Sequence, residues 1–322
     1  MPDAAAPLKL GANCWNQYTD YASWLAAMQR ADRLGYDSLW TWDHLYPIVG
    51  SAEGPILEAY TAMAAVAATT QRGTIGLMVG ANTFRNPALT TKMVTTLDHI
   101  SRGRAVLGIG AAWFETEHTA FGIPFGEGPP ERLRWLGQAL PIMRGMLDGT
   151  APSAPHGIYS AQAVRNDPPP LQKHLPILVG GSGREVTLKL VARYADACNV
   201  GGGVGPVREC ETALVRHCET LGRDEREIER TTGLGVAVIR DSREEAARVA
   251  AALYERNGGA RIWDDQPVGT PEDVVEQVAP YLELGYRHLI FGFPSGYDEE
   301  TMTRLATEVR PRLEALVAPR PA

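Results

Sequence analysis

The sequence predicts an α/β fold, a (β/α)8 TIM barrel with insertions, on the strength of two observations. Short apolar, β-branched runs alternate with longer stretches of helical period, and such crossovers connect parallel strands. Eight of these units in 322 residues match an eight-stranded barrel better than a six-stranded open sheet. We expect one barrel domain over residues 1–322, with insertions near residues 113–130, 150–172 and 257–269.

The expected strands are short runs rich in aliphatic and β-branched residues. They cover residues 8–13, 37–42, 74–79, 104–109, 177–179, 195–199, 232–239 and 287–291. Two of the intervening helices have clear start signals. Asn86 is a capping residue followed by Pro87 at the first helical position, and Thr270 precedes Pro271 in the same way.

Composition excludes several classes of protein. The net charge of -7 and the absence of a basic run argue against a nucleic-acid partner. No apolar stretch approaches the roughly 20 residues that span a bilayer, and the start shows no signal peptide, so we expect a cytoplasmic protein without a membrane partner. The cysteines lack CxxC spacing, which favours free thiols and predicts no metal site. They are Cys14, Cys198, Cys210 and Cys218.

The most informative pair is Asp43 and His44, which directly follow the expected strand over residues 37–42. A strand that leads straight into ionisable groups is how α/β enzymes present catalytic side chains. The alternative is a buried histidine that is satisfied by its neighbouring aspartate. The ends of the other strands bear on this choice.

In a barrel, the segments after the strands meet at one face. Here they combine small residues, aromatic residues and a few amides, a mixture that suits a flat aromatic cofactor and suits a hydrolase poorly. Cys14 is the thiol expected near this pocket. The segments contain Asn13, Trp15, Gly80, Ala81, Gly110, Ala111, Ala112, Trp113, Asn199 and Phe293.

The turn Gly180-Gly181-Ser182-Gly183 precedes a helix that we expect to start near Arg184, with Val186 on its apolar face. Backbone N–H groups and the helix dipole there favour an anion, and a cofactor phosphate is the natural occupant. The alternative is an ordinary strand–helix turn with Ser182 as its capping residue.

Three other readings are rejected. The glycines at 108 and 110 suggest a dinucleotide-binding turn, but Trp113 replaces the third glycine and no helix is expected there. Glu115, Glu117 and His118 match no metal-ligand motif, and we expect a solvated loop. Ser182 lacks the nucleophile-elbow pattern of serine hydrolases.

Several motifs in this order resemble the luciferase-like flavin/deazaflavin oxidoreductases, and most closely the branch that uses coenzyme F420. They lie at residues 42–44, 83–88, 107–113, 180–183, 191–196 and 268–272. The resemblance spans nearly the whole chain. It implies a barrel, often a homodimer, with F420 or FMN in its mouth, and a cis peptide at or beside Met78–Val79.

The resemblance also implies roles for single residues. His44 and Asp43 are the expected catalytic pair beside the cofactor ring, with His44 as acid or base and Asp43 orienting it or raising its pKa. The expected cofactor-binding residues are Asn13, Met78, Val79, Gly80, Ala81, Gly110, Ala111, Ala112, Thr116, Gly180, Gly181, Ser182 and Gly183.

One departure concerns the substrate. In the sugar-phosphate dehydrogenase branch, a glutamate proton donor stands where this chain has Trp113, and the phosphate-gripping basic residues have no evident counterparts. The expected substrate is therefore apolar or aromatic, in a pocket formed by Trp15, Trp113 and Phe293.

We therefore expect an oxidoreductase that moves a hydride between deazaflavin C5 and a small organic molecule, with the cofactor supplying the redox chemistry. An FMN-dependent monooxygenase is the alternative enzyme, and a flavin-binding protein without turnover is the alternative outside catalysis.

Overall fold

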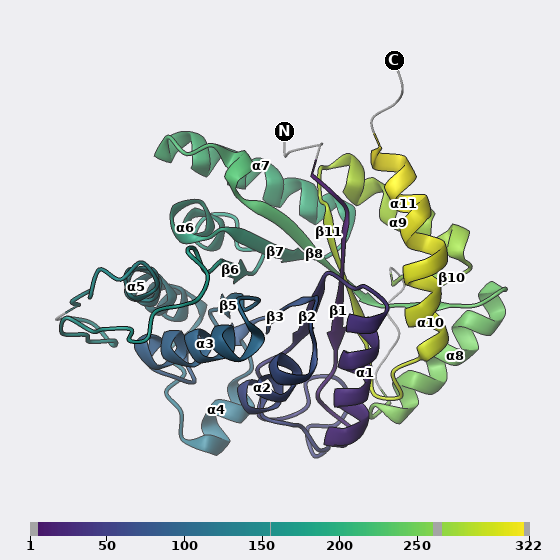
Figure 1. The fold of residues 1–322 in the computed structure, drawn as a ribbon, viewed down its shortest axis with the longest axis horizontal. Helices are drawn as coiled ribbons and strands as arrows, with labels where there is room; N and C mark the ends of the chain where they lie inside the picture. The colour runs from purple at the N-terminus through teal and green to yellow at the C-terminus, as the bar shows by residue number, and fades with distance from the viewer. Residues whose placement is uncertain (1–5, 155, 260–265, 319–322) are drawn as a thin grey trace.

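The computed structural model describes residues 6–154, 156–259 and 266–318 and shows the expected barrel (Figure 1). All its neighbouring strands are parallel, in the order β3-β2-β1-β11-β8-β7-β6-β5-β4. β3 and β4 are successive parts of one barrel strand, and β3 closes the ring through hydrogen bonds of Ile75 with Arg104 and Val106. The barrel strands are β1 Lys9–Cys14, β2 Ser38–Thr41, β3 Thr74–Leu77, β4 Gly80–Ala81, β5 Leu107–Gly110, β6 Ile177–Gly180, β7 Ala197–Gly201, β8 Glu229–Val236 and β11 His288–Phe293.

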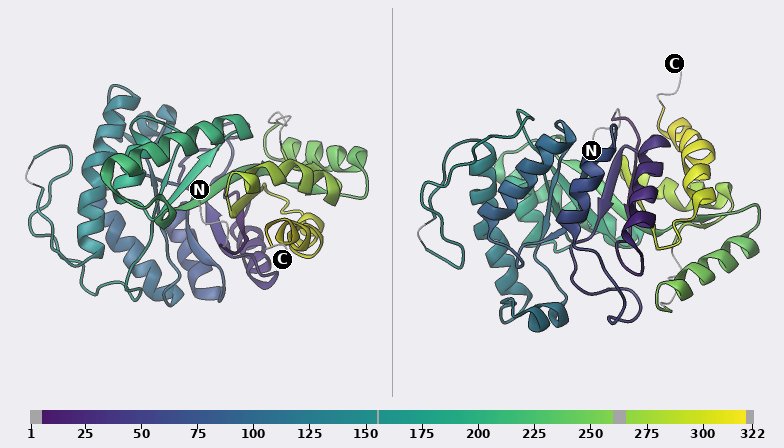
Figure 2. Two further views of the ribbon diagram at one scale, coloured as in Figure 1. Left: turned by 90° about the horizontal axis from the view of Figure 1, so that it is seen from above. Right: turned by 60° about the horizontal axis from the view of Figure 1, so that its bottom comes forward.

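Helices surround the barrel, and two further views show them as an outer layer (Figure 2). They are α1 Tyr21–Arg33, α2 Ala59–Thr69, α3 Pro87–Ser101, α4 Glu115–Phe121, α5 Pro129–Leu147, α6 Thr187–Tyr194, α7 Val204–Leu221, α8 Arg243–Arg256, α9 Pro271–Glu283, α10 Glu299–Arg304 and α11 Arg310–Val317, with the short turns η1 Glu225–Glu227 and η2 Leu305–Val309. None of the helices in the described ranges is long and apolar enough to cross a membrane.

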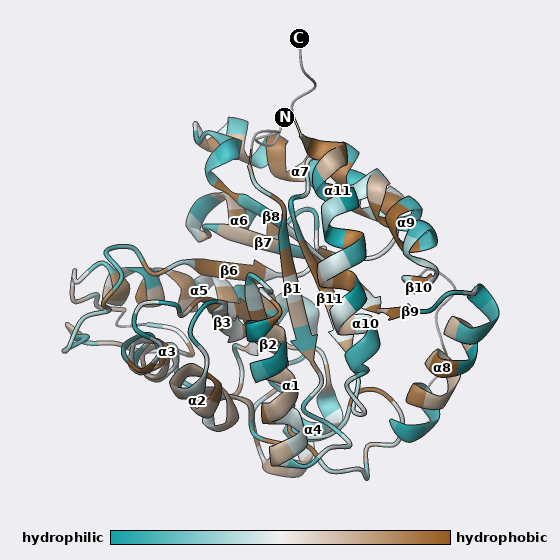
Figure 3. Ribbon diagram, turned by 45° about the vertical axis from the view of Figure 1, so that its right-hand side comes forward, coloured by the Kyte–Doolittle hydropathy of each residue, from teal (hydrophilic) through white to brown (hydrophobic). Residues whose placement is uncertain are grey.

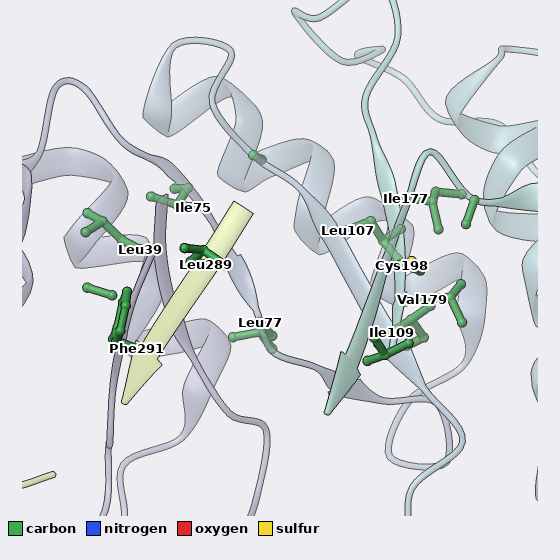
Figure 4. Packing of buried hydrophobic residues seen from close by; sticks show 14 of the residues in the cluster. Leu39, Ile75, Leu77, Leu107, Ile109, Ile177, Val179, Cys198, Leu289 and Phe291 are labelled. Atoms are coloured by element: carbon green, nitrogen blue, oxygen red, sulfur yellow. The ribbon is translucent and has the colours of Figure 1, made fainter. Parts of the chain in front are cut away.

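Alternate strand residues serve two different cores. Residues such as Leu39, Ile75 and Phe291 belong to the large cluster between the strands and the helices (Figure 4). Trp40 and Ile290 are adjacent to Leu39 and Phe291 in their strands, and they form a smaller cluster with residues from other strands. This two-sided burial is why the strands read as continuous apolar runs, and Figure 3 shows brown stretches along several strands, whereas the surrounding helices carry both teal and brown segments.

Polar side chains also meet between strands. Ser38 bonds the Nε2 atom of His288 at 2.6 Å, and His288 Nδ1 lies 2.9 Å from Glu229. The ammonium of Lys9 lies 2.9 Å from the same carboxylate. Each of these residues begins a different strand, so the network ties β1, β2, β8 and β11 together at their amino ends.

Both expected helix starts are confirmed. Asn86 accepts a hydrogen bond from the Ala88 amide at the start of α3. Thr270 and Asp273 form a reciprocal capping box at the start of α9, which satisfies amides that lack helical partners.

Two boundaries differ from expectation. The single strand expected over residues 232–239 divides into β8 and β9 Val238–Ile239, and β9 pairs with β10 Val268–Gly269 outside the barrel. Gly235, at φ +73°, breaks the extended backbone there. Helix α6 begins at Thr187 instead of near Arg184, and Val186 is exposed because it precedes the helix.

The expected insertions lie between barrel units. The expected insertion near residues 150–172 lies between α5 and β6. Ala154 and Ala161 form an isolated antiparallel β-bridge there. Part of the insertion expected over residues 257–269, namely residues 260–265, lies outside the described residues.

Candidate active site

A cavity of about 360 Å³ lies at the carboxyl ends of the barrel strands, and we call it the central cavity. Its walls come from the segments after β2, β3, β5, β6 and β7. It is lined by Trp42, Asp43, His44, Ile48, Met78, Val79, Gly80, Ala81, Gly110, Ala111, Ala112, Trp113, Gly180, Gly181, Thr187 and Asn199.

Val79 lines the central cavity, and the Met78–Val79 peptide bond before it is cis, as the resemblance implied. A Cβ on Gly110 would lie 2.7 Å from Val79, and a Cβ on Gly180 would lie 2.8 Å from it. Both distances are too short for real carbon contacts, so glycine at these strand ends leaves room for the Val79 side chain.

Asp43 is buried and forms structural links beside the cavity. Its carboxylate accepts a hydrogen bond from the Ala81 amide at 2.9 Å and two from the Arg85 guanidinium at 2.7 and 3.1 Å. Arg85 also pairs with Glu58 at 2.8 Å. Burial lowers the pKa of Arg85, but the charge and hydrogen bond of Asp43 outweigh it and raise that pKa above its ordinary value. Asp43 is therefore engaged with Arg85 and not with His44.

His44 is held by a carboxylate that lies far away in the sequence. The Nδ1 atom of His44 lies 2.8 Å from one oxygen of Glu117, and the other oxygen accepts a hydrogen bond from the Leu45 amide at 2.7 Å. The Glu117 side chain is only 1% exposed. Because Nδ1 is taken, Nε2 is the ring nitrogen of His44 left for a molecule in the central cavity.

Glu117 corrects two sequence expectations. The segment from Glu115 was expected as a solvated loop, but it forms helix α4, with Glu117 and His118 buried on its inner side. His118 bonds Thr83 and the Phe114 carbonyl, and burial lowers its pKa. Asp43 was expected to orient His44, but Glu117 does so. The helical spacing that buries Glu117 and exposes Glu115 was the signal that the sequence offered.

Aromatic rings cover the other side of His44. Trp113 and Phe114 lie edge-on to its ring, with centroids at 5.6 and 6.2 Å. Trp113 is 59% exposed although it lines the central cavity. Such an exposed indole offers an apolar surface to a bound molecule.

A second cavity of about 310 Å³ lies next to the first, and we call it the side cavity. The Trp15 ring lines it and lies 4.9 Å, centroid to centroid, from Trp42 of the central cavity. The side cavity is lined by Trp15, Val49, Gly202, Gly233, Leu234, Gly235, Val236, Tyr254, Gln266 and Tyr281.

Some expected site residues line neither cavity. Thr116 is exposed on α4, and Ser182 and Gly183 are exposed beyond the cavity wall. Phe293 is 1% exposed and packs edge-on to Tyr36, because its side chain joins the core under the helices.

Two residues from the end of β1 also line neither cavity. Asn13 is half-buried, and its side-chain oxygen accepts no hydrogen bond from the described residues. Cys14 lies in the core, where burial raises the pKa of its thiol to about 12. Cys14 therefore does not lie at the pocket as expected.

The central cavity fits a flat aromatic cofactor. Half of its lining residues are glycine, alanine or valine, and such small side chains allow a ring to approach the backbone closely. The indole N–H of Trp42 is buried and has no hydrogen-bond partner in the described structure. Within the described ranges, no group of three or more His, Cys, Asp or Glu side chains is arranged to hold a metal ion.

Comparison with known proteins agrees with this geometry. A model of the luciferase-like monooxygenase family matches residues 8–267. The chain belongs to this family. Among its luciferase-like relatives is the F420-dependent glucose-6-phosphate dehydrogenase of Microbacterium testaceum, 29% identical over 88% of this chain and 90% of that protein. The enzyme of the same name from Nakamurella multipartita is 30% identical over 89% and 91%.

Solved structures of low sequence identity share the luciferase-like fold. An F420-dependent secondary alcohol dehydrogenase, in complex with an F420–acetone adduct, matches 96% of this chain and 99% of its own, with a TM-score of 0.80 and 20% identity. The monooxygenase RslO1 from Streptomyces bottropensis also has a TM-score of 0.80, with 19% identity over 95% and 99% of the two chains. The names of these relatives are those of oxidoreductases, and the chain is an enzyme of that class.

Proposed function

We propose that this chain is a coenzyme F420-dependent oxidoreductase that transfers a hydride between deazaflavin C5 and a small apolar or aromatic organic substrate. The carrying observation is the pairing of His44 with the buried Glu117 at the wall of a glycine-lined cavity. The F420-dependent dehydrogenases that align over most of the chain support the choice of cofactor.

The chain's own residues divide the binding task. Val79, Gly110 and Ala111 would contact the ring, and Gly180 and Gly181 would hold the part toward the phosphate. When bound, the deazaflavin would accept or donate the hydride at C5. The remaining task for the protein is to orient the substrate and to move one proton.

His44 is suited to move that proton. In alcohol oxidation, the carbon-bound hydrogen leaves as hydride, and the hydroxyl proton passes to a base within hydrogen-bond reach. Nε2 of His44 is the available base, since Glu117 fixes the ring through Nδ1. In the reverse direction, the same nitrogen returns the proton to the carbonyl oxygen.

The lining of the two cavities favours an uncharged substrate. Within the described part of the chain, no lysine or arginine that could pair with a phosphate lines either cavity, and Arg85 beside the central cavity is already bound to Asp43 and Glu58. Trp113 stands at the rim with an exposed apolar surface. This arrangement supports an apolar or aromatic molecule over a sugar phosphate.

Binding of the two candidate cofactors tests the proposal. We expect oxidised F420 to bind with micromolar affinity and FMN to bind much more weakly, as followed by fluorescence. The description of the matched family and the monooxygenase RslO1 favour the alternative, an FMN-dependent monooxygenase. A preference for FMN would move the assignment to it, and binding of neither cofactor would contradict both.

Replacing His44 with alanine separates an enzyme from a protein that only binds flavin. We expect the rate of hydride transfer to fall about 10²- to 10⁴-fold, the usual contribution of a general acid or base, while the Kd for F420 changes less than about threefold. Stopped-flow absorbance of the deazaflavin measures both. An unchanged rate would remove His44 from the mechanism.

We also propose a cytoplasmic homodimer, as the resemblance implies. Light scattering coupled to size-exclusion chromatography would give a mass of twice 34.9 kDa for the dimer. Cell fractionation would test the location.

A further inference from the structure

The side cavity is separated from the central cavity by a shared aromatic wall. Trp15 and Trp42 lie with centroids 4.9 Å apart and planes tilted by 36°. The neighbouring residues Ile48 and Val49 line the central and the side cavity, respectively. The two cavities are therefore neighbours, and a molecule with its reacting end near His44 would have to pass the Trp15–Trp42 pair to reach the side cavity.

Among the described residues, the walls of the side cavity carry no charged side chain. Trp15, Leu234, Val236 and Tyr254 are among its lining residues, and Trp15 and Tyr254 meet edge-on at 6.3 Å. Uncharged walls cannot compensate the desolvation of a phosphate or carboxylate, so an ionic ligand is disfavoured.

Gln266 is the polar group of this wall with hydrogen-bonding capacity to spare. Its side-chain oxygen accepts hydrogen bonds from the Val236 amide at 3.2 Å and from the Tyr254 hydroxyl at 2.5 Å. These contacts fix the amide group, and its NH2 donates to no residue of the described structure. One neutral acceptor on a ligand, such as a carbonyl or ether oxygen, would accept a hydrogen bond from this NH2 group.

Glycine keeps the side cavity open. A Cβ on Gly233 would meet no atom within 4 Å, although Gly233 lies in β8 between paired residues of β7 and β11. A larger residue there would extend into free space. The emptiness therefore depends on side-chain size at this position and does not result from poor packing of the core.

We propose that the side cavity is a substrate subsite for an uncharged hydrophobic tail, with Gln266 donating to a neutral oxygen on it. The proposal rests on the proposed function for the identity of the reacting end. It adds that the substrate is too long to fit in the central cavity alone. The length of its hydrophobic tail would then determine its affinity for the protein.

The test measures binding of 2-butanone, 2-hexanone and 2-octanone, through tryptophan fluorescence, to protein loaded with oxidised F420 and to cofactor-free protein. Burial of each methylene should tighten binding roughly fourfold until the cavity is filled. Gly233→Leu fills the side cavity and should reduce this gain to less than about twofold per methylene. Gly205→Leu, at an exposed position of α7 with open space around it, is the matched control and should keep the full gain.

The outcomes separate the subsite from the proposed function. A length dependence that is lost in Gly233→Leu supports the subsite with or without F420 binding, whereas absence of F420 binding contradicts only the proposed function. An equal length dependence in Gly233→Leu, or none in the unmodified protein, overturns the subsite. Glucose 6-phosphate provides a charged competitor. If it displaces 2-octanone from the unmodified protein but does not bind Gly233→Leu, the assignment of the side cavity to a neutral ligand is overturned.

Discussion

Asp43 and His44 are neighbours in the chain but have different partners. Asp43 bonds Ala81 of β4 and Arg85, so it fixes the backbone beside the cavity. His44 faces α4 and bonds Glu117. The acid–imidazole pair read from the sequence is therefore two separate pairs, and Glu117 is the positioning residue for the imidazole.

Replacing Glu117 with glutamine tests that role. The glutamine oxygen can accept from the Leu45 amide while its NH2 donates to Nδ1 of His44, which leaves the ring proton on Nε2 and removes that nitrogen as a base. We expect kcat to fall about 10- to 100-fold, with KM and the F420 Kd within about threefold. Steady-state kinetics measure this split.

Glu115→Gln is the control, because Glu115 is exposed on the same helix. It should leave kcat unchanged, and Glu117→Asp should recover part of the lost rate. A loss of affinity in Glu117→Gln with kcat intact would show that Glu117 supports only the shape of the cavity.

The Asp43–Arg85 pair should act mainly on stability. Their side chains are 1% and 14% exposed, so Asp43→Ala leaves a largely buried guanidinium without its main partner. We expect a cost of about 3–5 kcal/mol in the free energy of unfolding. Urea denaturation measures the stability of Asp43→Ala, of Arg85→Met and of the double variant. The double variant should lose less free energy of unfolding than the sum of the losses in the two single variants. Additive costs would contradict the coupling.

At the scale of elements, the sequence predicted what local signals encode. Two-sided burial marked the barrel strands, and Asn86 and Thr270 marked helix starts through their own side chains. Helix α4 was missed because it has seven residues and no side-chain cap. The start of α6 was misplaced because Val186, an apolar residue, precedes the helix exposed. Such boundaries depend on tertiary contacts, which local propensity does not contain.

Strand β5 tolerates no side chain at Gly108. A Cβ there would lie 1.9 Å from the backbone oxygen of Leu77 in β3, which cannot move without breaking the barrel. We expect Gly108→Ala to cost at least about 3 kcal/mol, at or beyond the upper end of overpacking effects. Thermal and urea unfolding measure it.

Gly137→Ala provides the matched control for Gly108→Ala. Gly137 lies inside α5, and its added Cβ would lie 3.5 Å from Leu190, an ordinary contact. This variant should gain about 0.5–1 kcal/mol from helix propensity. A Gly108→Ala protein as stable as the unmodified one would show that β3 and β5 are not in the described contact.

The whole molecule is joined by contacts that no local pattern reveals. Glu229 of β8, Lys9 of β1 and His288 of β11 meet although they are far apart in the chain. The same holds for His44 and Glu117 at the opposite ends of the strands. The sequence could place each residue at a strand end, but the partner across the barrel follows only from closure of the sheet.

The Glu229 network predicts a pH dependence of stability. Burial raises the pKa of Glu229, but the hydrogen bonds and charges of His288 and Lys9 outweigh it and lower the pKa from 4.5 to about 2. A depressed native pKa means that the ionised carboxylate stabilises the fold above about pH 4.5 and that this contribution is lost as pH falls toward 2. Because the Glu229 side chain is 38% exposed, solvent screens part of the effect.

Glu229→Gln should therefore be less stable than the unmodified protein at pH 7, and the difference should shrink steadily between about pH 4.5 and pH 2.5. Urea denaturation across this range measures it. Glu227→Gln is the control, since that carboxylate is exposed and contacts Arg223 on the surface. A difference that stays constant as pH falls would mean that Glu229 acts through packing and not through its charge. Such a result would remove the ionic tie between β1, β8 and β11 from the account of barrel closure.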